Sequence, residues 1–188
     1  MRYIKKFPAS LFELKDIRSL AVIAMLLALR IVLGMFANAT LPIFGNTVKF
    51  SAAFIPIAVT GAMFGPVPAG LVGALGDVLS FLIAPTGGAY FPGFTVSGLL
   101  TGLIYGFALY NEKLSLPRIA IAWAVNALVV ESFMAAYWLY ILYGQQPDYW
   151  FYLSARGISL AVKCAPEILI LFALGKPVTA LSRKLMKK

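Results

Sequence analysis

Almost the whole chain consists of apolar segments that are long enough to cross a membrane as helices. Short polar or Gly/Pro-rich connections separate them. A transmembrane helix needs roughly 20 such residues, because only a helix or a closed barrel satisfies all backbone hydrogen bonds within lipid. Of the 188 residues, 12% are charged, whereas a soluble domain has about 25%. The sequence therefore predicts an integral membrane protein and excludes an ordinary soluble enzyme.

We predict an all-α bundle of six transmembrane helices, in a single domain that covers residues 1–188. The six predicted helices are residues 19–39, 50–64, 66–84, 94–110, 118–143 and 151–174. A basic lead-in (1–18) and a basic tail (175–188) flank them, and residues 41–49 and 85–93 are turn-rich connections. A cleaved signal peptide is the alternative for the first segment, since Ala37-Asn38-Ala39 resembles a cleavage site. Arg30 interrupts that apolar segment and counts against cleavage.

The positions of the cations predict the orientation. All but four of the 16 Lys and Arg residues lie in the lead-in, in or next to the loop around residues 111–118, and in the tail. With six spans these three segments lie on one side of the membrane, and the positive-inside rule makes that side the cytoplasm. Both termini are then cytoplasmic, in a cell membrane. The remaining four cations lie in the outer half of the membrane or just outside it: Arg30, Lys49, Arg156 and Lys163.

Charges inside a membrane allow two interpretations here. Such charges are costly and need partners, and Lys163 and Glu167 have the i, i+4 spacing of an ion pair on one helix. Arg30 and Asp77 form a second possible pair. The alternative is a binding site for an anion, because Arg156 and other outer cations have no acidic partner even if both pairs form. A surplus of cations on the outer side favours an anionic ligand that arrives from outside.

An aromatic run lies in the second turn-rich connection. Tyr90, Phe91 and Phe94 surround Pro92-Gly93 and are able to form a stacking wall for a flat ring. The alternative is an ordinary belt of aromatic residues at the membrane interface.

Small residues predict two helix contacts. The glycines at residues 98, 102 and 106 form a stripe that we expect to pack inside the bundle. Ala24 and Ala28 lie nearly opposite Arg30 at 100° per residue. If Arg30 faces the interior, the two alanines face outward, toward another helix or another protein.

Several classes of function are excluded by residues that the chain lacks. It has no His and one Cys, Cys164, which excludes the common zinc sites and His-dependent nucleophilic catalysis. It also lacks a phosphate-cradling P-loop. We therefore expect no enzyme activity, no metal and no cofactor, and we assign the net charge of +9 to membrane topology and not to nucleic-acid binding.

Three segments resemble a known family: ALRIVLG (28–34), FGPVPAGLVGALGDVLSFLIAPTGG (64–88) and YFPGFTVSGLLTGLIYG (90–106). They are similar to the substrate-binding (S) components of energy-coupling factor (ECF) vitamin transporters, and most similar to the folate-specific member. The resemblance implies binding of folate on the extracellular side and a complex with a transmembrane coupling protein and two cytoplasmic ATPases. It also implies that Ala24 and Ala28 contact the coupling protein.

The ligand that the resemblance implies matches the outer residues in chemistry. Folate has a flat pterin, a benzoyl ring and a dianionic glutamate tail. The residues expected at the folate site are Arg30, Lys49, Asp77, Tyr90, Phe91, Pro92, Gly93, Phe94, Thr95, Arg156 and Lys163. Among them, the cations suit the glutamate, the aromatic rings suit stacking, and Asp77 is a possible partner of the pterin. The alternatives are an S component for riboflavin, thiamine or pantothenate, and a membrane subunit without a transport role.

Overall fold

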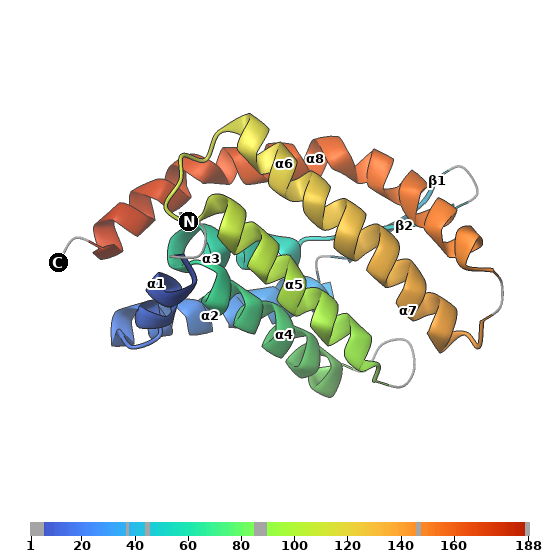
Figure 1. Ribbon diagram of the computed structural model, residues 1–188, viewed down its shortest axis with the longest axis horizontal. Helices are drawn as coiled ribbons and strands as arrows, with labels where there is room; N and C mark the ends of the chain where they lie inside the picture. Colours follow the sequence, from blue (N-terminus) through green and yellow to red (C-terminus); the bar gives the residue numbers. More distant parts are fainter. Residues whose placement is uncertain (1–5, 37, 44–45, 85–89, 146–147, 187–188) are drawn as a thin grey trace.

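The computed structural model describes residues 6–36, 38–43, 46–84, 90–145 and 148–186 and, within these ranges, all side chains except those of 38–49 and 183–186. The elements, in chain order (Figure 1), are α1 Lys6–Glu13, α2 Ile17–Phe36, β1 Asn38–Ile43, β2 Asn46–Ser51, α3 Phe54–Phe64, α4 Pro66–Ile83, α5 Pro92–Leu109, α6 Leu116–Asn126, the π-helical segment η1 Ala127–Met134, α7 Ala135–Leu142 and α8 Tyr149–Met186.

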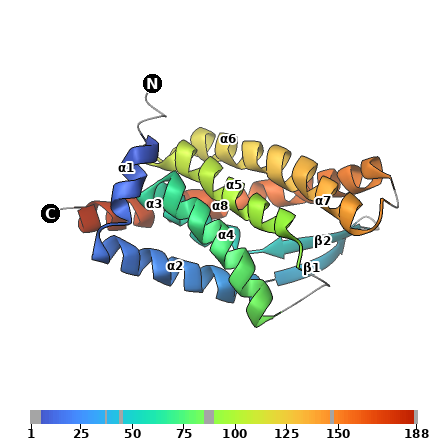
Figure 2. The same cartoon turned by 60° about the horizontal axis from the view of Figure 1, so that its bottom comes forward.

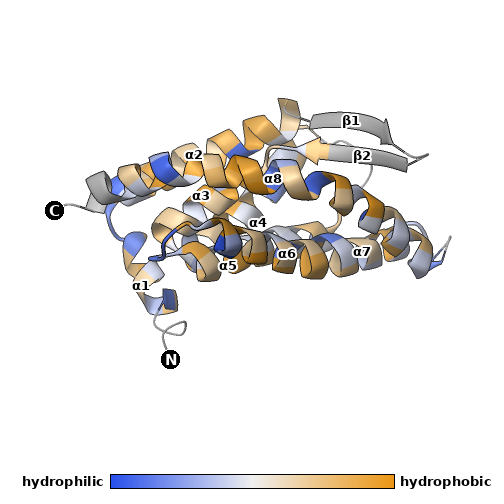
Figure 3. Ribbon diagram, turned by 90° about the horizontal axis from the view of Figure 1, so that it is seen from above, coloured by the Kyte–Doolittle hydropathy of each residue, from blue (hydrophilic) through white to orange (hydrophobic). Residues whose placement is uncertain are grey.

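The long helices lie along one another and give the molecule two distinct ends. Figure 2 shows the β1–β2 hairpin at one end, and α1, the first described helix, with the last turns of α8 at the other. We call these the hairpin end and the terminal end; the loop between α5 and α6 is at the terminal end (Figure 1). α4 packs against α5, α2 packs against α3 and α4, and α8 packs against α3, α6, η1 and α7; hydrophobic residues are spread along these helices (Figure 3). One core cluster contains Ile23, Ile57, Met63, Phe64, Val72 and Val178.

The prediction of an all-α membrane fold is confirmed. Within the described ranges, five helical spans are long and apolar enough to cross a membrane. The second predicted helix, 50–64, corresponds to α3, which has 11 residues, so at 1.5 Å per residue it is only about 16 Å long. It runs from the hairpin to Gly65, where a positive φ of 91° turns the chain directly into α4. The single domain of residues 1–188 stays a prediction.

The first connection is a β-hairpin, which corrects the expectation of an irregular turn at residues 41–49. β1 and β2 pair antiparallel, with Thr40 opposite Lys49 and Ile43 opposite Asn46. The segment contains several β-branched and aromatic residues, which favour extended backbone. Pro42 is tolerated because each strand of a two-stranded sheet has a free edge. Strand pairing also ends the first long helix at Phe36, three residues before its predicted end.

Glycines allow α4 and α5 to pack with their backbones in close contact. A Cβ atom on Gly73 would overlap the backbone of Gly98, and one on Gly102 would overlap the backbone of Ala69. The expected packing of the glycine stripe inside the bundle is therefore confirmed. In lipid, no hydrophobic effect favours the association of two helices. Close van der Waals packing at small residues stabilises the contact instead.

The predicted helix at 118–143 contains a change of helical type. The span Leu116–Leu142 consists of α6, η1 and α7 in succession. π-Helical turns are wider than α-helical turns and occur often at functional sites. η1 contains Glu131, so the direction of this carboxylate differs from that of a regular α-helix.

The predicted last helix, 151–174, is too short at both ends, because α8 has 38 residues and continues into the basic tail. The tail residues that follow 174 are mostly good helix formers, so the helix does not need to stop where the apolar run stops. Pro166 and Pro177 lie inside α8, where each removes one backbone donor.

The lead-in contains α1, which packs across the terminal end. Lys6 is buried and donates to the carbonyl oxygen of Phe107 at 3.1 Å and to the carboxylate of Glu112 at 3.2 Å. Arg118 forms a second ion pair with Glu112. Hydrogen bonds from Arg118 and Lys6 hold the pKa of Glu112 below its usual value, although burial acts in the opposite direction. α1 is thus tied to the loop between α5 and α6.

Candidate functional site

A chain of hydrogen bonds joins α4 to the start of α5 near the hairpin end. Thr95 Oγ1 donates to Asp77 Oδ2 at 2.7 Å, and the Tyr90 hydroxyl lies 2.6 Å from Thr95 Oγ1. A threonine hydroxyl has one proton to donate, so Tyr90 is the donor to Thr95. The Tyr90 ring contacts Phe81, with centroids 5.3 Å apart. These contacts hold the carboxylate of Asp77, whose side chain is half-buried.

Arg30 lies beside this chain of hydrogen bonds. Its side chain is buried against Gly76, where a Cβ atom would overlap the guanidinium group. Asp77 interacts with it electrostatically, but within the described residues the two groups form no direct ion pair. Arg30 Nε has no hydrogen-bond partner. The predicted pairing of Arg30 with Asp77 therefore holds as proximity and not as a contact.

The aromatic run forms a packed cluster with a residue that the sequence did not single out. Phe91 has its ring 5.9 Å from Phe94 and 5.6 Å from Trp138 of α7. Trp138 Nε1 donates to Ser97 Oγ at 3.0 Å. A Cβ atom on Gly93 would overlap both Phe91 and Trp138.

The start of α5 is well defined by its sequence. Pro92 occupies the first turn, where a missing backbone donor costs nothing. We call Arg30, Asp77, Tyr90, Thr95 and the Phe91–Phe94–Trp138 rings the aromatic cluster. It contains six of the predicted site residues, Arg30, Asp77, Tyr90, Phe91, Phe94 and Thr95; Gly93 packs against Phe91 and Trp138, and Pro92 is exposed.

A second group of charges lies between η1 and α8, and we call it the cationic cluster. Lys163 Nζ is 3.4 Å from Glu131 Oε2. Arg156, half-buried and two turns from Lys163 on α8, interacts electrostatically with the same carboxylate. Two cations thus face one anion. The described residues give Arg156 no direct ion pair.

The predicted contact of Lys163 with Glu167 is wrong, because within the described residues the two groups interact electrostatically without a direct ion pair. Glu167 is 6% exposed and accepts a hydrogen bond of 2.7 Å from Trp123 Nε1 on α6. The i, i+4 spacing makes Lys163 and Glu167 neighbours on one helix, but a carboxylate on the facing π-helical segment lies nearer to the ammonium. Among the described residues, Glu131 is the carboxylate in direct contact with the cationic cluster, whereas Glu167 interacts with Lys163 without a direct contact.

Both clusters lie in the half of the molecule toward the hairpin end. At 1.5 Å per residue, Asp77 lies about 9 Å from the end of α4, and Arg156 about 10 Å from the start of α8. β2 packs against α8 on the same side. Lys49 is on β2 opposite Thr40, but its side chain lies outside the described residues. The role of Lys49 in ligand binding, expected from the sequence, therefore stays a prediction.

The alanines of α2 face away from the interior. Ala24 and Ala28 are exposed, whereas Arg30 on the same helix is buried, so the predicted opposite facing is confirmed. That a partner helix covers these alanines stays a prediction. Within the described ranges, no group of three His, Cys, Asp or Glu residues is placed to hold a metal ion.

Comparisons with known proteins agree with one another. Residues 18–179 match the family model described as "ECF transporter, substrate-specific component". A protein of Clostridium novyi named "Folate transporter FolT" is 39% identical over 132 residues, which are 70% of this chain and 74% of that protein. The similarly named protein of Leuconostoc mesenteroides is 30% identical over 139 residues, 73% of this chain and 72% of that protein.

A solved structure has the same fold. It is described as "Crystal structure of FolT bound with folic acid", superposes with a TM-score of 0.75 at 28% identity, and the match covers 86% of this chain and 95% of that chain.

Proposed function

Because the chain belongs to the substrate-specific components of ECF transporters, we propose that the aromatic and cationic clusters together form its folate site. The chain binds folate and serves its uptake as an S component, and it is a transport component and not an enzyme. The family implies that an ECF module supplies the energy. The arrangement of residues around folate is our proposal.

The unequal charge of the two clusters carries this assignment. In the aromatic cluster Arg30 and Asp77 balance each other, whereas in the cationic cluster two cations, Arg156 and Lys163, share Glu131 as the nearby carboxylate, and Glu167 is engaged by Trp123. A dianionic glutamate tail suits the cationic cluster, because charge-assisted hydrogen bonds to carboxylates are the strong ones. The neutral pterin, which carries N–H donors, suits the cluster that offers a free carboxylate oxygen.

The Asp77 carboxylate is able to accept hydrogen bonds from the N–H groups of the pterin. An ionised carboxylate has about four acceptor sites, and the hydrogen bond from Thr95 uses one of them. Tyr90 and the Phe91–Phe94 pair provide rings for stacking beside this carboxylate. This arrangement supports stacking as the role of these rings, in preference to a general interface belt.

The test is a comparison of folate with pteroate, which lacks the glutamate tail. Binding of each ligand to the purified protein is measured by isothermal titration calorimetry. Arg156→Gln should weaken folate binding about 10- to 150-fold, the range that one charge-assisted contact of about 1.5–3 kcal/mol gives, and should leave pteroate binding nearly unchanged. Asp77→Asn should weaken both ligands by a similar factor. Arg18→Gln, which removes an exposed cation at the terminal end, is the matched control.

Two outcomes would contradict the assignment. Equal weakening of folate and pteroate by Arg156→Gln would mean that Arg156 does not contact the tail. Tighter binding of riboflavin, thiamine or pantothenate than of folate would favour the alternative vitamins.

For the assembly, we propose that a transmembrane coupling protein with two ATPases docks on the α2 face that contains Ala24 and Ala28. Their exposure and small size support close approach of another helix. We also propose that the terminal end faces the cytoplasm, which the cations gathered there support.

A further inference from the structure

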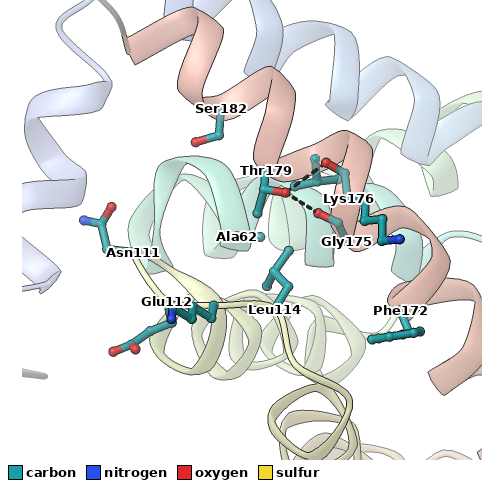
Figure 4. A pocket seen from close by; sticks show the side chains of 11 residues that line it. Ala62, Asn111, Glu112, Leu114, Phe172, Gly175, Lys176, Thr179 and Ser182 are labelled. Carbon is teal, nitrogen blue, oxygen red and sulfur yellow. Dashed lines mark hydrogen bonds between the residues drawn. The ribbon is translucent and has the colours of Figure 1, made fainter.

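A cavity of about 480 Å³ opens at the terminal end, far from the folate site. Its walls come from α3, from the loop between α5 and α6, and from α8, and it includes none of the residues assigned to folate. Figure 4 shows Lys176, Thr179 and Ser182 of α8 on one side, and Asn111, Glu112 and Leu114 of the loop on the other. The volume falls within the range of about 300–1,000 Å³ typical of small-molecule pockets.

The charge of this cavity is positive. Lys113 and Lys176 are exposed cations that line it, and within the described part of the chain neither has an ion-pair partner. The carboxylate that also lines it, Glu112, is already engaged by Lys6 and Arg118. The charge of Glu112 is therefore balanced by cations outside the lining, and the ammonium groups of Lys113 and Lys176 are available to an anionic ligand.

The face of α8 that lines the cavity continues as an apolar stripe. Lys176, Phe172, Leu169 and Ala165 follow one another at spacings of four, three and four residues, so they lie on one side of the helix. Phe172 and Leu169 are 43% and 60% exposed, and Ala165 is exposed as well. The stripe runs from the cavity toward the middle of the membrane span.

With the proposed orientation, the cavity lies where the helices leave the membrane, at the depth of the lipid headgroups. The loop that forms one wall, Asn111 to Leu114, connects the end of α5 to the start of α6. A ligand at this level with an anionic head for the lysines and a hydrocarbon chain for the stripe is an anionic phospholipid. Basic pockets between transmembrane helices are known to bind such headgroups.

We propose that this cavity binds the headgroup of an anionic phospholipid, with Lys113 and Lys176 holding its phosphate and an acyl chain lying along Phe172 and Leu169. A soluble anion would leave the apolar stripe unused. The α2 face assigned to the coupling protein contributes none of the lining residues. The site is therefore distinct from both the folate site and that docking face.

The experiment is native mass spectrometry of the full-length protein in detergent, with dioleoyl phosphatidylglycerol or dioleoyl phosphatidylcholine added. Wild-type protein should retain one phosphatidylglycerol and bind phosphatidylcholine much more weakly. Because each cation near a lipid headgroup contributes about 1 kcal/mol, Lys113→Gln with Lys176→Gln should weaken phosphatidylglycerol binding about 30-fold. Lys15→Gln with Arg18→Gln removes two exposed cations outside the cavity, and it should have little effect.

Folate binding should be unchanged in both double variants, which shows that each is folded. Equal loss of phosphatidylglycerol from the two double variants, or equal binding of the two lipids by wild-type protein, would overturn the proposal. So would displacement of the lipid by millimolar inorganic phosphate, because the site would then be one for free phosphate. If a purified ECF module protects Lys113 and Lys176 from acetylation while phosphatidylglycerol does not, the cavity is a protein-docking surface instead.

Discussion

Replacing Lys163 by Met is the most informative single perturbation of the cationic cluster. The ammonium group lies 3.4 Å from the carboxylate of Glu131, and the two side chains are 12% and 28% exposed. Removing it leaves Glu131 with its electrostatic interaction with Arg156. The variant therefore separates a structural role of the lysine from a role in holding the ligand.

The loss in free energy of unfolding caused by Lys163→Met should lie between the values for a buried and a surface ion pair. Breaking a fully buried pair costs about 3–5 kcal/mol, because the remaining charge is uncompensated, whereas a surface pair contributes about 0–1 kcal/mol. Glu131 is partly exposed and keeps the interaction with Arg156, so we expect the folate-free protein to lose about 1–2 kcal/mol of its free energy of unfolding.

The partner of Lys163 is identified by two double-mutant cycles. Lys163→Met combined with Glu131→Gln should show a coupling energy of about 1 kcal/mol, within the range for residues in contact. Lys163→Met combined with Glu167→Gln should be additive within about 0.5 kcal/mol, because Glu167 bonds to Trp123 instead. Free energies of unfolding are measured by titrating mixed micelles with a denaturing detergent and following tryptophan fluorescence.

The same variants report on ligand contact. If Lys163 touches the glutamate tail, Lys163→Met should reduce the preference for folate over pteroate; if it only orients Glu131, both ligands should weaken by the same factor. A larger coupling energy with Glu167 than with Glu131 would refute the geometry of the cationic cluster.

Three further predictions concern other parts of the molecule. Replacing Ala24 and Ala28 by Trp should abolish folate uptake in cells while calorimetry on the isolated protein shows near-normal binding, because bulk there blocks a partner helix; equal loss of binding would place these alanines inside the bundle. The pKa of Glu112 is lowered in the folded state by its two cations, so its contribution to stability is present above the normal Glu value of about 4.3 and is lost as the pH falls through the lower folded value. Glu112→Gln should therefore flatten the acid limb of a stability profile, and an unchanged limb would contradict the pairing. With the native cysteine replaced, a cysteine at Tyr143 should react with an impermeant maleimide in intact cells and one at Ser115 only after permeabilisation; the reverse pattern would invert the topology.

The proposed folate site was only partly predictable from the sequence. The residues of the aromatic cluster between 90 and 95 were identified because they lie together in one unusual run, and Arg30 and Asp77 because a charge in an apolar segment demands an explanation. Trp138 and Ser97 were missed, because the hydrogen bond between them joins residues 41 positions apart. A tryptophan in an apolar helix is otherwise indistinguishable from a member of the interfacial belt.

The ion pairs were also only partly predictable from the sequence. The spacing of Lys163 and Glu167 identified neighbours on one helix, but spacing carries no information about the helix that packs opposite. The π-helical segment and the packing of η1 against α8 decide that Glu131 is the nearer partner. The hairpin was missed because residues 41–49 contain turn-forming and strand-forming residues together, and pairing between the two strands stabilises the extended form.

The sequence by itself determined the membrane environment, the helical class, the inward glycine stripe and the opposite facing of Ala24 and Arg30. Each of these depends on properties that are local along the chain: the hydropathy of a segment, the lack of a side chain at a position, or the 100° rotation per residue of a helix. Only the tertiary structure decided which carboxylate neutralises which cation, which ring closes the aromatic cluster, and that Lys113 and Lys176 line one cavity. Those contacts join distant parts of the chain, and they form only when whole helices pack against one another.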